Sequence, residues 1–225
     1  MGRIVFSLFL LLSTGVVANA GIISVTGDFA VQPSATASYL GNGYNDASPS
    51  PIRIWREQTN IVLSSAVRLD TDLADSSLHY VTSGAGAGET SFAAASGPVL
   101  AAGTRVNVYY AYFDPLNDSA SGTVTFGEEI LGISAYTGQL QFSDFLRVPG
   151  ALYPGNPAFS LRGWEQTERG NIDALRTTFT FEGVASSPGD QFRIFTVAQV
   201  PEPSSLLLLI TGLGGILFSR RRAKS

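Results

Sequence analysis

Apolar and polar side chains alternate along most of the chain between residues 21 and 199. Segment 106–113 (VNVYYAYF) shows the pattern most clearly, because Val and Tyr occupy its even positions with a period of two. Its odd positions include Tyr109, Ala111 and Phe113, which are apolar or aromatic as well. A strand with two such faces needs cover on both sides, so this segment is predicted to be a central strand.

The same alternation recurs in three further segments, 52–57, 176–183 and 191–197. These segments are rich in residues that pleated sheets favour, and clusters of Gly, Pro, Asn and Ser separate them. About nine to eleven strands in one domain require two packed sheets. The prediction is an all-β fold, an antiparallel β-sandwich or jelly-roll-like single domain over residues 21–199. One helical turn is expected at 143–148, with Ser143 as its cap.

The first twenty residues have the parts of a secretory signal peptide. Arg3 provides the positive start, the run 4–17 is uncharged and mainly apolar, and the small residues Ala18 and Ala20 follow. Small side chains at these two positions suit the pocket of signal peptidase, which excludes bulky ones. Signal peptidase is therefore expected to cut after Ala20, so that the mature chain begins at Gly21.

Residues 200–225 also divide into three parts, VPEP at 200–203, an uncharged run at 204–219 and a basic tail at 220–225. As a helix the run rises only about 24 Å, against about 30 Å of bilayer hydrocarbon. The predicted transmembrane helix is therefore short and weakly held. The basic tail should stay cytoplasmic, which places the body outside the inner membrane. The two prolines favour an extended stretch before the run.

The residues assigned to processing are Val200, Pro201, Glu202 and Pro203, and those assigned to membrane retention are Arg220, Arg221 and Arg222. A Pro-Glu-Pro element, a short apolar run and a terminal Arg cluster, in this order, resemble the PEP-CTERM sorting signal of Gram-negative bacteria. The resemblance implies cleavage near Pro-Glu-Pro by a membrane-embedded exosortase. It also implies an exported protein of the envelope or extracellular matrix, usually in species that make exopolysaccharide.

Part of the body resembles the globular domain of a subgroup of these exported proteins. The matching segments, in order, are LHYVTSG, YYAYFDP, GTVTFGEEILGI, LRGWEQ and GDQFRIFTV. These motifs are strand patterns without chemistry of their own. The resemblance therefore implies a β fold and no particular activity.

The charge of the body narrows the class of partner. Without Arg3 and the four basic residues of the tail, the body holds 9 basic and 18 acidic side chains, a net charge of −9. An acidic body with no basic run argues against nucleic acid as a partner. Surplus acid is typical of soluble exported domains and is also compatible with divalent-cation binding. The lack of Cys and the single His79 exclude the usual zinc sites.

Two catalytic arrangements can be rejected from the sequence. His79 has serines two and three residues away, but strand neighbours do not reach hydrogen-bond geometry with its ring, and no G-x-S-x-G motif is present. Glu128 and Glu129 are adjacent, so their carboxylates should face opposite sides of a strand. They cannot line one cleft as a glycosidase pair would.

A third arrangement stays open. Glu165 and Glu168 could face each other around a loop, with Trp164 as a platform for a sugar. Loop charges paired with neighbouring arginines explain the two glutamates equally well. Trp55 and Trp164 could likewise form part of a sugar-binding face or belong to the core, where aromatic residues of β proteins usually lie.

Close-spaced aspartates raise the question of a calcium site. Asp70 and Asp72 are two residues apart, and Asp114 and Asp118 follow a predicted strand. No Gly at the sixth place and no Glu at the twelfth follow Asp70, so an EF-hand is excluded. An irregular Ca²⁺ site remains open, and Asp114 could equally be a turn residue ahead of proline. No cofactor is predicted.

The sequence as a whole predicts a secreted, non-enzymatic protein of the cell surface or of an exopolysaccharide matrix. Its expected partners are signal peptidase, an exosortase, exopolysaccharide and, transiently, the membrane. Two alternatives from other classes are a carbohydrate-binding module and a polysaccharide-active enzyme.

Overall fold

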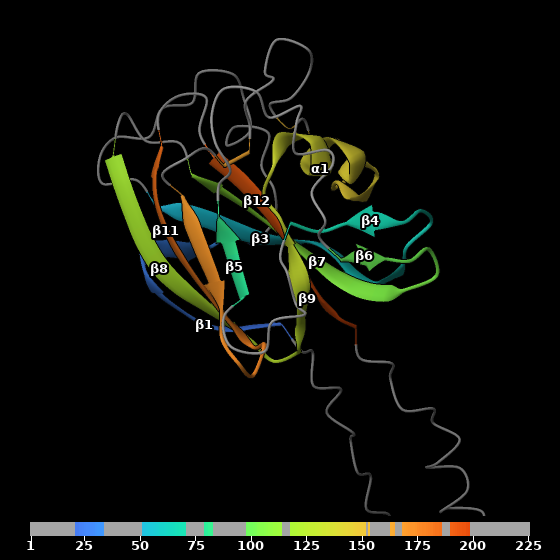
Figure 1. The fold of residues 1–225 in the computed structure, drawn as a ribbon, viewed down its shortest axis with the longest axis horizontal. Helices are drawn as coiled ribbons and strands as arrows, with labels where there is room; N and C mark the ends of the chain where they lie inside the picture. Colours follow the sequence, from blue (N-terminus) through green and yellow to red (C-terminus); the bar gives the residue numbers. More distant parts are fainter. Residues whose placement is uncertain are drawn as a thin grey trace, which may run out of the picture. The chain divides into compact units, whose positions relative to one another are not determined.

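The computed structural model describes residues 21–33, 51–70, 79–82, 98–113, 118–151, 153, 163–164, 168–185 and 190–198. All of them belong to one compact unit, Ala20–Val200. The strands of this unit form two five-stranded sheets and one small two-stranded sheet (Figure 1).

Sheet 1 has the order β1 (Ile22–Gly27), β8 (Asp118–Phe126), β11 (Thr178–Ala185), β10 (Arg169–Ile172) and β5 (His79–Thr82). Sheet 2 has the order β2 (Phe29–Val31), β3 (Ile52–Val62), β7 (Arg105–Phe113), β12 (Asp190–Val197) and β9 (Ile130–Ser134). The small sheet pairs β4 (Val67–Arg68) with β6 (Val99–Leu100). All described pairings are antiparallel except that of β2 with β3, which is parallel. Two short helical elements, α1 (Thr137–Phe142) and the 3-10 helix η3 (Asp144–Leu146), follow β9.

The inner faces of the two large sheets share one aromatic core. Phe179 and Phe181 of β11 enter it from sheet 1, and Phe192 of β12 meets both, with ring centroids 5.4 Å apart in each pair. Tyr109 and Phe126 meet across the sheets as well, at 4.7 Å. Each such buried side chain contributes roughly 1.5–3 kcal/mol, so this core is the main source of stability.

The prediction for segment 106–113 is confirmed, because β7 lies in the middle of sheet 2 and is buried on both faces. Its Tyr109 face enters the shared core. On the opposite face its valines cluster with Leu146 of η3, and Tyr110 and Tyr112 cluster with Leu140 of α1. The helical segment therefore covers the outer face of sheet 2.

The chain passes from sheet 1 to sheet 2 at Gly27 and Asp28. Gly27 has a φ of 66°, in the left-handed region that favours glycine, and a Cβ there would lie 2.3 Å from the carbonyl oxygen of Ser121. The N–H of Asp28 donates to that same oxygen at 2.9 Å, and its carbonyl accepts from the N–H of Ile52 at 2.8 Å. These contacts hold the Asp28 side chain beside β8.

The prediction of an all-β fold is confirmed, with three differences in detail. The structure describes twelve strands, and the excess over the expected number comes from the two-residue strands β4 and β6. Helix α1 was not predicted, because six residues are too few to show a helical stripe. The predicted turn is present as η3, and Ser143 occupies its N-cap position, but the side chain makes no capping hydrogen bond; its hydroxyl donates to the Gln139 carbonyl at 2.8 Å.

Candidate functional site

Hydroxyl side chains line the outer face of sheet 1. The alternation of β8 and β11 turns Val124, Phe179 and their apolar neighbours inward and leaves Ser and Thr outside. The outward residues form rows across three strands, namely Ser24, Thr125 and Thr178 in one row and Thr26, Thr123 and Thr180 in the next. Hydroxyl oxygens of neighbouring strands lie 3.3 Å apart in the second row and 3.4 Å apart in the first.

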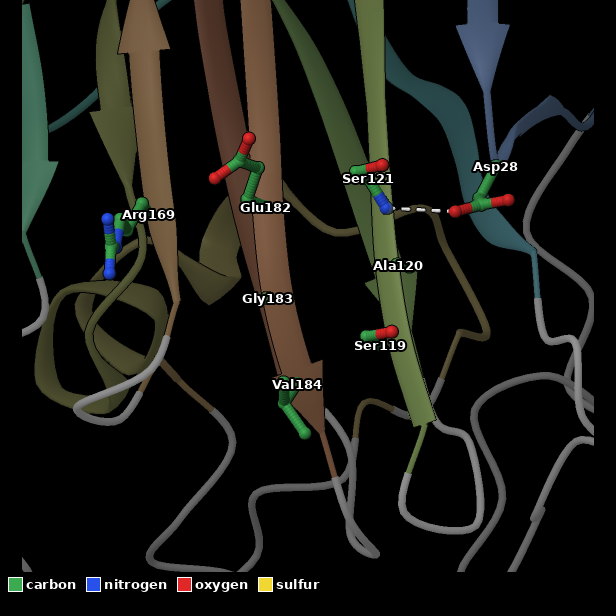
Figure 2. A pocket seen from close by; sticks show the side chains of 8 residues that line it. All are labelled: Asp28, Ser119, Ala120, Ser121, Arg169, Glu182, Gly183 and Val184. Carbon is green, nitrogen blue, oxygen red and sulfur yellow. Dashed lines mark hydrogen bonds between the residues drawn. The ribbon is translucent and has the colours of Figure 1, made fainter.

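A shallow, open concavity of about 460 Å³ lies at the end of these rows (Figure 2). It is lined by Asp28, Ser119, Ala120, Ser121, Arg169, Glu182, Gly183 and Val184. Figure 2 shows β8 running between the Asp28 and Glu182 side chains. The concavity thus joins residues from β8, β10, β11 and the corner between β1 and β2.

The concavity combines hydroxyl, carboxylate and guanidinium groups. Arg169 and Glu182 are opposite each other in the register of β10 and β11, and both side chains are exposed. On the far side, one carboxylate oxygen of Asp28 accepts a hydrogen bond from the N–H of Ser121 at 2.8 Å. Such groups can donate to and accept from the hydroxyls of a sugar chain.

A second polar cluster is buried on the outer face of sheet 2. The Arg193 side chain is fully buried; its Nε donates to Glu57 Oε2 at 2.5 Å and its Nη2 to Glu57 Oε1 at 3.1 Å. Its Nη1 donates to the Leu140 carbonyl at 3.2 Å and to the Ser143 hydroxyl. The guanidinium carbon also lies 4.8 Å from the centre of the Tyr110 ring. These bonds fasten the helical segment to sheet 2.

The electrostatics of this buried cluster follow from its ion pair. Burial by itself lowers the pKa of Arg193, but the adjacent Glu57 carboxylate outweighs it and raises that pKa above its usual value. Burial, followed by the charge of Glu57, also raises the pKa of Tyr153, whose hydroxyl donates to Glu57. The arginine therefore stays charged and the tyrosine stays neutral. The sequence did not predict this cluster. In the sequence Arg193 is a single charged residue within an alternating strand, and its partner Glu57 is distant in the chain.

Among the predicted calcium ligands, the structure describes Asp70 and Asp118, whereas Asp72 and Asp114 lie outside the described residues. Asp70 uses Oδ2 to accept from the N–H groups of Ala135 at 2.7 Å and Tyr136 at 3.1 Å. Asp118 Oδ1 accepts from the N–H of Ser119 at 2.8 Å. No group of three or more metal-binding side chains occurs within the described part of the chain.

Asp70 gives the domain a predicted pH dependence. Burial raises its pKa from 3.8 to about 7, despite the two backbone donors, which lower it. Between these values the folded state keeps a proton that the unfolded state loses. Stability should therefore fall by at most about 4 kcal/mol as the pH rises through this range, and then level off. Urea unfolding of the wild type and of Asp70→Asn at several pH values measures this, and curves that run parallel would contradict it.

The two adjacent glutamates lie before β9 and not in a strand, and their environments differ, which agrees with the prediction that they do not share one cleft. Glu128 is buried, and its Oε1 accepts from Asn107 Nδ2 at 2.7 Å and from the Tyr109 hydroxyl at 3.1 Å. Glu129 is exposed and pairs with Arg176 at 3.1 Å. His79 is the first residue of β5.

The structure corrects the idea that Trp164 forms a platform for sugars. Trp164 is only 1% exposed, and its ring packs in the shared core, 5.2 Å from Phe181 and 5.4 Å from Phe192. Trp55 is buried too, so both tryptophans take the core role that the sequence left open. Glu168 is buried, and Glu165 lies outside the described residues.

The residues predicted for processing and for membrane retention also lie outside the described residues. These are Ala18, Ala20, Val200, Pro201, Glu202, Pro203, Arg220, Arg221 and Arg222. Within the described residues, no helix has the length and apolar character that crossing a membrane requires. The described fold reaches Ala198, so the predicted sorting signal begins almost directly after it.

An all-β domain followed by this tripartite tail defines the class of an exported protein that carries its own C-terminal sorting signal. Residues 199–222 match the family model described as the PEP-CTERM protein-sorting motif, which confirms the resemblance seen in the sequence. The motif makes the chain an exported substrate targeted to an exosortase. No curated protein and no solved structure matches the chain significantly.

Proposed function

We propose that this protein is a non-enzymatic component of the cell surface or extracellular matrix, in which a β-sandwich domain is delivered by a disposable sorting signal. The observation that carries the proposal is the sorting motif at residues 199–222. Two large sheets around one core support the β-sandwich or jelly-roll-like architecture of this proposal.

The proposed route has two cleavages. Signal peptidase removes residues 1–20, and the apolar run 204–219 then holds the chain in the inner membrane with the basic tail inside. Because this run is shorter than the hydrocarbon core, it serves as a transient anchor. An exosortase cuts near Pro201–Pro203 and passes residues 21–199 to the outer surface or the medium.

Three described glutamates support the non-enzymatic part of the proposal through the bonds that they make. Glu57 is bonded to Arg193, Glu128 to Asn107 and Glu129 to Arg176. In each case the partner belongs to the fold, so these carboxylates act as structural acceptors. A general acid or base must instead reach the group whose proton it transfers.

The outer face of sheet 1 supports association with exopolysaccharide. It presents rows of hydroxyls that end in a concavity with the exposed Arg169 and Glu182. Polar groups of this kind exchange hydrogen bonds with sugar hydroxyls without an aromatic platform. This face replaces Trp164 as the surface on which a carbohydrate would be bound.

The test uses the secreted mature protein and exopolysaccharide isolated from the matrix of the producing cells. The wild type should sediment with the polysaccharide, and Arg169→Gln combined with Glu182→Gln should bind at least about tenfold more weakly, since the loss of even one charge-assisted bond of about 1.5–3 kcal/mol has that effect. The matched control, Arg176→Gln with Glu129→Gln, removes the same charges elsewhere and should bind normally.

The alternatives give different results in the same experiment. A wild-type protein that stays in the supernatant would refute the association with exopolysaccharide. Release of oligosaccharides during the incubation would favour the polysaccharide-active enzyme over the non-enzymatic component. Retention that Arg169→Gln with Glu182→Gln leaves unchanged would place the binding surface away from the concavity.

A further inference from the structure

Both ends of the described fold meet at one turn, residues 127–129. At the start of the domain, the carbonyl of Gly21 accepts from the N–H of Gly127 at 2.9 Å. At the end of β12, the N–H of Val197 donates to the carbonyl of Glu129 at 2.8 Å. Gly21 and Ala198 therefore lie at the same end of the domain, where β1 begins and β12 ends (Figure 1).

The C-terminal end is fixed in place. β12 lies between β7 and β9 in sheet 2, and Ala198 just beyond it is 4% exposed. Peeling the strand away would break two ladders and remove Phe192 from the core. The sorting motif starts at residue 199, directly after this fixed end. Ala198 is therefore a fixed point at the end of the described fold.

Little chain separates that point from the proposed membrane anchor. Residues 199–203 are five in number, and five residues span at most about 18 Å when fully extended. The headgroup layer of one leaflet takes up about 5–8 Å of this span. The end of the domain is thus held within about 10–13 Å of the headgroups before cleavage.

The same end carries an exposed apolar tip. The turn between β10 and β11 lies beside residues 126–130, because the Arg176 carbonyl accepts from the N–H of Ile130 at 2.6 Å and the Thr177 carbonyl from that of Phe126 at 2.8 Å. Leu175 in this turn is 79% exposed, the largest exposure among the large hydrophobic side chains described. Next to it, the charges of Arg176 and Glu129 are paired.

We infer that this end of the domain, formed by turns 127–129 and 173–177 and called the exit face, lies against the lipid surface of the membrane in the uncleaved precursor. Leu175 enters the interface and the Arg176–Glu129 pair lies among the headgroups. A leucine beside a neutralised charge pair suits such an interface, while the −9 charge of the whole body does not favour an anionic one. The inference rests on the proposed membrane anchor at 204–219. Cleavage by the exosortase ends the contact.

The chain has no cysteine, so a single Cys can carry a fluorophore at a chosen place. Leu175→Cys is compared with Val184→Cys, which is also an exposed aliphatic residue of sheet 1 but lies six residues along β11, about 20 Å from its start. Full-length labelled protein is reconstituted into zwitterionic vesicles of phosphatidylethanolamine and phosphatidylcholine, with or without brominated acyl chains. Bromine quenching should be at least about threefold stronger at position 175, as expected for a site at the interface.

Two further measurements distinguish a failure of the inference from a failure of the proposed membrane anchor at 204–219. A ten-residue Gly-Ser insertion after Ala198 should reduce the quenching at 175 towards the value at 184, because the tether no longer holds the exit face down. Equal quenching at the two sites in protein that floats with the vesicles would overturn the inference alone. Protein that fails to float with the vesicles would overturn the anchor and the inference with it. The vesicles contain no exosortase, so quenching at position 175 reports contact with lipid and not with the enzyme.

Discussion

Replacing Pro201 and Pro203 together by alanine should leave the full-length chain in the membrane fraction. Each proline disfavours helix by about 3 kcal/mol relative to alanine, so the double variant allows the apolar helix to continue through the segment that the exosortase must bind extended. The processed form should fall at least about tenfold, since even 1.4 kcal/mol of lost extended conformation has that effect. Pulse-chase labelling with membrane fractionation and mass measurement follows the two forms.

Deletion of Arg220–Arg222 tests the other half of the same signal. Without the three arginines only Lys224 is left to keep this end of the run inside, so unprocessed full-length protein should again stay in the membrane fraction. Pro149→Ala is the control for the double proline variant, because this proline is exposed and lies outside the motif. If either signal variant reaches the medium at the wild-type rate and mass, the residues assigned to sorting are wrong.

Alternation along a strand was sufficient to predict what β7 does. A segment that is apolar or aromatic on both faces has to be covered on both sides, and the structure covers it with the shared core on one face and the helical segment on the other. The sorting motif could be predicted as well, since its proline element, apolar run and basic cluster follow one another directly in the sequence. Local patterns of this kind carry their information within about twenty residues.

Contacts between distant residues could not be predicted in this way. Arg193 and Glu57 are 136 positions apart, and nothing in the alternation of either strand distinguishes a buried charge from an exposed one. The concavity on sheet 1 also combines residues that are distant in the sequence. The register of β10 and β11 places Arg169 opposite Glu182, and the corner between β1 and β2 adds Asp28 to the lining. Trp164 was ambiguous because a loop-like sequence, LRGWEQ, delivers it to the core.

Arg193→Met should cost about 3–5 kcal/mol of the free energy of unfolding, because it leaves the buried Glu57 carboxylate without its cation. The loss should also release α1 and η3 from sheet 2, since Nη1 bonds the Leu140 carbonyl and the Ser143 hydroxyl. Glu57→Gln should cost a similar amount by leaving the guanidinium unpaired. Urea unfolding of the secreted mature protein, followed by the fluorescence of the buried Trp55 and Trp164, measures both.

The exposed pair provides the matched control for the buried one. Arg176→Met removes an arginine that lies 3.1 Å from a carboxylate at the surface, where such a pair contributes about 0–1 kcal/mol. Combining Arg193→Met with Glu57→Gln should cost much less than the sum of the two single changes, because the second change removes the group that the first left unpaired. Costs that simply add, or an Arg193→Met variant as stable as Arg176→Met, would show that the buried pair does not hold the helical segment to the sheet.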